Sequence, residues 1–384
     1  MLFPELFTTL FPELFTNIRR RNRYRLIIPR YTGSKRKVWP LIVGQGHYDA
    51  IIEPFAGGGS LSSRFASKWP AGAVFAADQN NCVRAVWQCW ADPGLHEAVY
   101  RAMDELISAM LAEFVDSVHG LGYTVAELSP LPTREAIGLK AAALLPETWS
   151  ALMAEYEAGL VDIADPARLA AVTLILHAVT YGGVSRDTPG SETLNIAPNY
   201  GQLEELTNPG KDRYCFPPAP AFPGLVSISG QWEEAISAFE ASSYSRGLAV
   251  LDPPYWLPYT PGTERGGTGA MSPSYFGHRP HAPETLAMAV DSARAMASSN
   301  KVARLVASNY YCAELDEAMK EIASAAGLQV HCHCLGVLNG LNRSRKSKTT
   351  NLDALWIFDK LALTKVQAEK AVAHNQEELN LWAS

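Results

Sequence analysis

The stretch IIEPFAGGGSL, residues 51–61, decides the fold of this chain. Its apolar first half predicts a buried strand that ends at Glu53, and Gly57–Gly59 predict a tight turn into a helix. Glycines in such a turn let the backbone approach a ligand closely. Ser62 stands where a dinucleotide fingerprint has its last glycine, and Asp212 follows the only Gly-Lys pair. The turn is therefore typical neither of an NAD site nor of a Walker A loop.

Short apolar runs and helical patterns alternate on either side of this turn. Strands are expected at residues 50–52, 73–77, 248–251, 302–307, 329–333 and 354–358. Helices are expected at residues 61–68, 80–90, 284–298 and 313–326. Strands that alternate with helices imply an α/β fold, in which helices cover both faces of a mainly parallel sheet.

A segment of different composition separates the first two strands from the third. Residues 95–245 contain helical patterns at 95–112 and 167–179, followed by a stretch rich in Gly and Pro. We expect this segment to be an inserted domain, largely helical and rich in loops. The sheet domain then consists of residues 31–94 and 246–362, and residues 363–384 predict a C-terminal helix.

Composition limits the class of protein. With 47% hydrophobic and 19% charged residues, the chain can bury a sizeable core. No apolar run is long enough to span a membrane, so no membrane association is expected. The six scattered cysteines do not suggest a disulfide framework, and the first residues lack the basic region of a secretory signal. These features favour the reducing cytoplasm.

Basic residues gather in two places although the net charge is −6. Residues 14–48 hold nine Lys and Arg, residues 322–352 hold four, and neither stretch contains an acid. Such local fields attract phosphates, although runs of charge are also common on solvated loops. Residues 1–30 form an arm that repeats LFPELFT. This arm is either mobile or an apolar tag that docks a protein partner or a second copy.

The stretch LAVLDPPYW, residues 248–256, carries a second set of chemical groups. Four apolar residues deliver Asp252 to a strand end, and Pro253 and Pro254 stiffen the loop that leads to Tyr255. The Asp252 carboxylate and the Pro253 carbonyl can each accept one N–H of an exocyclic amine, and Tyr255 can stack on the base that carries it. Asp78, which follows the second strand, can accept hydrogen bonds from ribose hydroxyls.

The chain resembles a known family at these positions. Residues 53–59 (EPFAGGG) and 252–255 (DPPY) are similar to the two signatures of Dam-like, adenine-specific DNA methyltransferases, and they occur in the same order. Residues 31–35 resemble the family's Trp-x-Gly-Gly-Lys motif, and residues 308–309 its late Ser-Asn. Weaker similarity extends over residues 181–186, 194–201, 338–345 and 353–355.

The resemblance implies a Rossmann-like sheet that binds S-adenosylmethionine, an inserted target-recognition domain, and methyl transfer to the N6 amine of adenine in double-stranded DNA. The implied catalytic residues are Asp252, Pro253, Pro254 and Tyr255. The implied cofactor-binding residues are Tyr31, Lys35, Glu53, Pro54, Phe55, Ala56, Gly57, Gly59, Asp78 and Asp252. The implied DNA-binding residues are Arg186, Asn195, Arg343, Arg345, Lys346 and Lys348. Such enzymes are bacterial or phage-encoded and occur in restriction-modification systems.

Three other interpretations fit parts of the sequence. The run from His331 to Cys334 invites a metal site, but on a strand its histidines and cysteines face opposite sides. We therefore expect buried strand residues there and no metal. A methyltransferase of another amine, such as cytosine N4, RNA adenine or a protein glutamine, stays open. So does a catalytically silent relative that binds nucleic acid, although the intact Asp252 and Tyr255 argue against it.

Overall fold

The computed structural model describes residues 35–120, 146–179, 224–256, 282–336 and 353–359. The chain divides into two compact units. The sheet unit consists of Gly33–Asn80 and Phe222–Ser384, and the helical unit of Met1–Thr32 and Asn81–Ala221.

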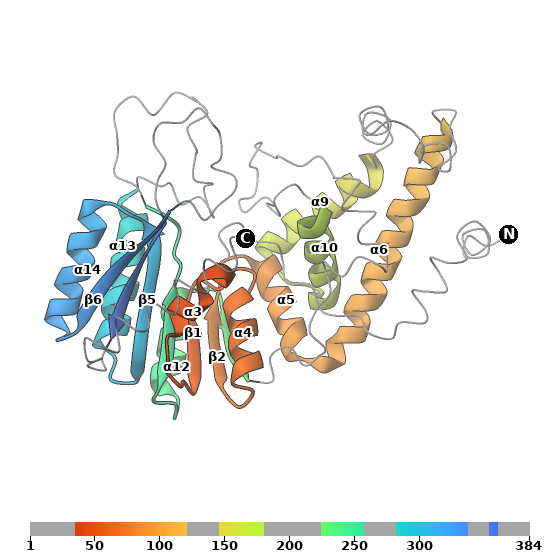
Figure 1. Cartoon of the computed structure of the whole chain (residues 1–384). Helices are drawn as coiled ribbons and strands as arrows, with labels where there is room; N and C mark the ends of the chain where they lie inside the picture. Colours follow the sequence, from red (N-terminus) through yellow and green to blue (C-terminus); the bar gives the residue numbers. More distant parts are fainter. Residues whose placement is uncertain (1–34, 121–145, 180–223, 257–281, 337–352, 360–384) are drawn as a thin grey trace, which may run out of the picture. The chain divides into compact units, whose positions relative to one another are not determined.

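The sheet unit contains seven strands in the order β3-β2-β1-β4-β5-β7-β6 (Figure 1). Their bounds are β1 Ala50–Glu53, β2 Ala73–Ala77, β3 Leu225–Ser229, β4 Gly247–Leu251, β5 Val302–Tyr310, β6 Gln329–Gly336 and β7 Asp353–Asp359. The first five strands in this order are parallel, and β7 runs antiparallel to both β5 and β6. This arrangement confirms the predicted α/β fold with a mostly parallel sheet.

Continuous burial explains why the central strands read as apolar runs. Every residue of β1, β2 and β4 is buried, as is typical of parallel strands with helices on both faces. The sheet unit has the helices η1 Lys35–Val38, α3 Trp39–Val43, α4 Ser60–Lys68, α12 Trp232–Ala241, α13 Pro283–Ser298 and α14 Ala313–Ala325. Helix α4 packs on β1 and β2, α12 on β1, β2 and β3, α13 on β4 and β5, and α14 on β6.

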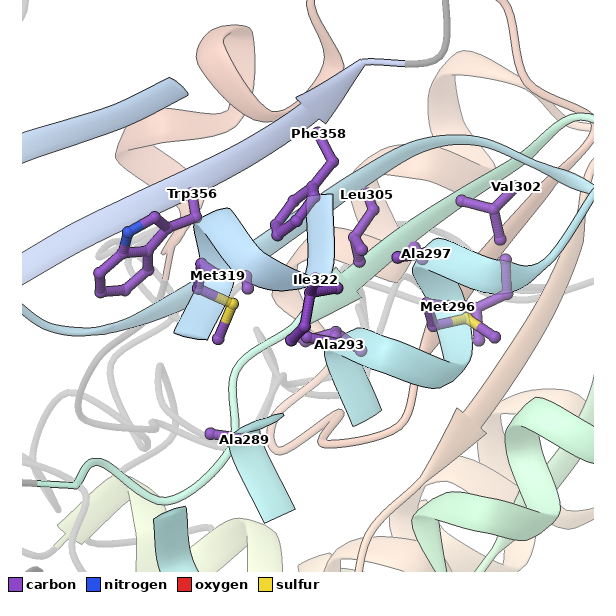
Figure 2. Packing of buried hydrophobic residues seen from close by; sticks show 14 of the residues in the cluster. Ala289, Ala293, Met296, Ala297, Val302, Leu305, Met319, Ile322, Trp356 and Phe358 are labelled. Atoms are coloured by element: carbon purple, nitrogen blue, oxygen red, sulfur yellow. The ribbon is translucent and has the colours of Figure 1, made fainter. Parts of the chain in front are cut away.

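A buried apolar cluster extends over β1, β2, β4, β5 and β7 and is covered by α12, α13 and α14. Figure 2 shows the part of it around α13 and α14. Small alanines of α13 let this helix approach the sheet, and Trp356 and Phe358 of β7 fill the space beside Met319 and Ile322 of α14. The indole N–H of Trp356 donates to the Asp316 carboxylate over 2.9 Å, so burial leaves this polar group satisfied.

The helical unit contains α5 Asn81–Ala91, α6 Pro93–Gly120, α9 Pro146–Val161 and α10 Pro166–Val179. Helix α10 is buried on nearly all sides because α5, α6 and α9 surround it, which explains why its sequence is apolar all round. Arg168 of α10 makes two hydrogen bonds, of 2.8 and 2.7 Å, to the Glu155 carboxylate of α9.

Some elements differ from the sequence-based expectation. Strand β3 and helix α12 fall within the range 95–245, yet they belong to the sheet unit, and helix α5 groups with the helical unit. The sequence pattern does not reveal strand β3 because serines interrupt its apolar residues, and the strand is partly exposed, with Val226 at 54% exposure. The expected C-terminal helix and the N-terminal arm lie outside the described residues.

The expectation of buried residues at 331–334 is wrong. These residues lie on β6, which among the described strands forms an edge of the sheet, and both Cys332 and Cys334 are exposed. An edge strand has one paired side, which leaves more of its surface open to solvent.

Candidate active site at the carboxyl ends of the strands

The turn after β1 has the shape that its glycines predict. Gly57 and Gly59 adopt φ angles of 50° and 70°, in the left-handed region where a side chain would be strained. Gly59 also caps the start of α4. The turn is tied to the end of β2, because the backbone N–H of Ala56 donates to the Ala77 carbonyl over 2.9 Å.

Asp78 lies beside this turn at the end of β2. Its carboxylate accepts hydrogen bonds of 2.8 Å from the backbone N–H of Gly57 and from that of Asn80. The half-buried side chain therefore shapes the glycine turn. A contact with ribose hydroxyls stays a prediction for this residue.

Glu53, at the end of β1, is only 5% exposed and stabilises the turn through hydrogen bonds to the start of α4. Its carboxylate accepts a hydrogen bond from the backbone N–H of Ser62 over 2.8 Å and a second one from the Ser62 hydroxyl. Burial, with a smaller contribution from the negative charge of Asp252, raises the pKa of Glu53 to about 7, although the hydrogen bonds from Ser62 oppose this shift. The residue that replaces the fingerprint glycine is thus the partner of a buried acid.

Asp252 follows the last residue of β4 and forms an ion pair with Lys35. The Lys35 ammonium lies 2.9 Å from each oxygen of the Asp252 carboxylate. Lys35 is 3% exposed and Asp252 28%. The same ammonium lies 4.9 Å from the centroid of the Tyr255 ring. The structure therefore brings Lys35, predicted to bind the cofactor, onto the predicted catalytic residues.

Tyr255 is fixed by its neighbours on β5. Its ring meets that of Tyr310 edge to face, with centroids 4.7 Å apart and planes at 83°. Burial raises the pKa of the Tyr255 hydroxyl well above its usual value, and the negative charges of Asp252 and Asp353 add to this shift. Tyr255 is therefore a neutral phenol.

Ser308 and Asn309, at the end of β5, contact the loop that contains Asp252. The Ser308 hydroxyl donates to the Asp252 carboxylate. The side-chain carbonyl of Asn309 accepts the backbone N–H of Trp256 over 2.8 Å and that of Tyr310 over 2.9 Å. Sequence reasoning noted this pair by resemblance and assigned it no role. The pair lies at the end of β5, the strand next to β4, and this position is the signal that could have indicated its role.

Trp232 is a further residue that sequence reasoning missed. It begins α12, directly after β3, and its ring lies 6.4 Å from that of Phe55 at an interplanar angle of 31°. Pro54, Ala56 and Pro253 are buried within the two loops. An aromatic residue shortly after a strand end is the pattern that could have revealed Trp232.

Several predicted site residues lie outside the described part of the chain. They are Tyr31, Arg186, Asn195, Arg343, Arg345, Lys346 and Lys348. Among the described residues, no group of three or more His, Cys, Asp or Glu is arranged to hold a metal ion. None of the described helices is long and apolar enough to cross a membrane.

Comparison with known proteins gives a family match for part of the chain. None of the curated proteins compared with the chain matches it. A family model described as D12 class N6 adenine-specific DNA methyltransferase matches residues 31–118. The matched range contains Lys35, the glycine turn and Asp78. On this match, residues 31–118 are similar to the D12 class of N6 adenine-specific DNA methyltransferases.

Proposed function

We propose that the chain transfers a methyl group from S-adenosylmethionine to the N6 amine of an adenine that has left its DNA duplex. One observation carries this proposal. Asp252 and Tyr255 stand together at the end of β4, and the glycine turn follows the adjacent parallel strand β1. Ligands of open parallel sheets bind outside the carboxyl ends of the strands.

The residues around the glycine turn fit the cofactor. Glycines at positive φ keep the turn free of side chains, and the N-terminus of α4 begins there. The half-buried Asp78 carboxylate is suited to ribose hydroxyls, and the Phe55 and Trp232 rings offer flat surfaces for a purine. When bound, S-adenosylmethionine supplies a sulfonium methyl carbon that an amine attacks in line, while the C–S bond electrons pass to sulfur.

Asp252 and the Pro253 carbonyl would accept the two N–H groups of the adenine amine. These bonds place the nitrogen and draw its lone pair out of conjugation with the ring. Lys35 balances the charge of the carboxylate and fixes its place from a buried position. Asp252 can accept the proton that the nitrogen loses after transfer. The work of the chain is thus orientation and electrostatics, which together can lower a barrier by roughly 7–11 kcal/mol in favourable cases.

Tyr255 would stack on the extruded base. Its ring is held by Tyr310 and its hydroxyl stays neutral, so it offers a fixed, uncharged face. Stacking on such a ring contributes about 1–3 kcal/mol per base. Arg186, Asn195 and the basic residues between Arg343 and Lys348 are proposed to bind the DNA around that base, with the inserted domain reading the target sequence.

Incubation with radiolabelled S-adenosylmethionine tests the proposal. The purified chain is incubated with double-stranded DNA or with RNA. Each nucleic acid is then digested to nucleosides, and the label in each separated nucleoside is measured. We expect label in N6-methyladenine from DNA. Label in N4-methylcytosine, in RNA or in protein would overturn the proposed substrate, and no label in any product would indicate a silent relative.

A further inference from the structure

We propose that Ser308 is a positioning residue for the methyl transfer, because its hydroxyl joins Tyr255 and Asp252 in one ordered chain of hydrogen bonds. The inference rests on the proposed function and adds a residue to its machinery. Ser308 lies on β5, is 2% exposed, and acts on the reaction through Asp252.

The direction of the chain follows from the count of protons. Ser308 has one hydroxyl proton, and the Asp252 carboxylate can only accept, so the Ser308 proton points to Asp252 Oδ1. The Tyr255 hydroxyl lies 3.4 Å from the Ser308 oxygen. Because the Ser308 proton is already committed, Tyr255 is the donor in this longer contact. The order is therefore Tyr255 to Ser308 to Asp252.

Strand pairing sets the position of Ser308. In the parallel ladder, Leu251 of β4 is aligned with Ala307 of β5, which places Asp252 and Ser308 side by side. Asn309, the next residue, holds the far end of the same loop through the Trp256 N–H. The end of β5 thus forms hydrogen bonds with both the first and the last residue of the catalytic loop, Asp252 and Trp256.

Ser308 supplies what Lys35 does not. The Lys35 ammonium lies at the same distance from both Asp252 oxygens, so it balances the charge without distinguishing one oxygen from the other. The Ser308 hydroxyl donates to Oδ1 alone. It therefore selects one rotation of the carboxylate plane, and it links that rotation to the tyrosine on which the base is proposed to stack.

Three variants test this role. Ser308→Ala removes the donor, and Ser308→Cys keeps nearly the same volume with a weak donor. Ser292→Ala is the matched control, because Ser292 is also a fully buried serine of the sheet unit and its hydroxyl donates to the Ala289 carbonyl within α13. For each variant, kcat, the KM values for S-adenosylmethionine and DNA, and the melting temperature are measured beside the parent.

We expect both Ser308 variants to lower kcat by about ten- to a hundredfold, since each loses a hydrogen bond to a charged group. KM for S-adenosylmethionine should change less than about threefold, and Ser292→Ala should keep the parent kcat. A kcat within about twofold of the parent for Ser308→Cys would overturn the inference. The inference would also be overturned if the Ser308 variants lost activity only in proportion to a lowered melting temperature, because the loss would then come from unfolding. Failure of the proposed function is recognised separately, because the parent would then form no N6-methyladenine.

Discussion

The two ends of the sheet carry polar networks of similar composition and different purpose. At the amino end, Arg304 of β5 donates to the carbonyls of Ile42 and Leu41 over 2.9 and 3.1 Å and pairs with Asp359 of β7. Asp49 accepts two backbone N–H groups there. These charged side chains bind backbone groups or each other, and they hold α3 and the loops around the sheet in place.

At the carboxyl end, the charged groups converge on two loops. Asp252 is bound by Lys35 and Ser308 and is still 28% exposed, while Asp78 and Glu53 shape the glycine turn. The difference teaches that hydrogen bonding alone does not mark a functional site. What marks it is a set of fixed charges that meets at strand ends and keeps access to solvent. Damage at the amino end should therefore cost stability, and damage at the carboxyl end should cost activity.

The largest expected loss of stability follows from Arg304→Ala. The substitution leaves Asp359 without its ion pair and frees two carbonyls at the end of α3, and both charged side chains are at most 15% exposed. We expect the free energy of unfolding to fall by about 3–5 kcal/mol in urea titration. Arg294→Ala, which removes an ion pair more than half exposed on both sides, is the control and should change it by less than about 1 kcal/mol. Equal losses would contradict the contrast.

Glu53 makes stability depend on pH. Its pKa in the folded chain is about 7, against an ordinary value of 4.5. Between these values the folded state binds more protons than the unfolded state, so the free energy of unfolding falls as the pH rises from about 4.5 to 7 and then stays level. The contribution is about 3 kcal/mol over this window. Comparison of unfolding curves at several pH values should show a flatter dependence for Glu53→Gln, and an unchanged slope would contradict the assignment.

Asp78→Ala compares the two ends directly. Asp78 and Asp49 each accept two backbone N–H groups, at opposite ends of the strands. We expect Asp78→Ala to weaken S-adenosylmethionine binding by about ten- to a hundredfold in calorimetric titration, which corresponds to about 1.5–3 kcal/mol. Asp49→Ala should leave this affinity unchanged. If both variants bind like the parent, Asp78 does not belong to the cofactor site.

The sequence predicts features that local chemistry determines. Gly57 and Gly59 could be read because a left-handed turn needs glycine, and Asp252 could be read because an apolar run ends there. Strand β3 could not be predicted in the same way, since Ser227 and Ser229 interrupt its apolar residues.

Contacts between residues far apart in the chain could not be predicted from local sequence patterns. Lys35 and Asp252 lie 217 positions apart in the chain, and Ser308 lies 56 positions beyond Asp252. The pairing of β4 with β5 brings Asp252 and Ser308 together, and Lys35 reaches Asp252 from η1, which packs against α4. The residues of the site were therefore largely predictable one by one, and their hydrogen bonds to each other were not.

The most direct test of the central claim is the turnover of Asp252→Ala. The carboxylate is proposed to accept an N–H of the target amine, a contact needed in the transition state. We expect kcat for N6-methyladenine formation to fall by at least about a hundredfold. Binding of S-adenosylmethionine should weaken far less than turnover, and Asp49→Ala should turn over normally. Turnover of Asp252→Ala within tenfold of the parent would contradict the account.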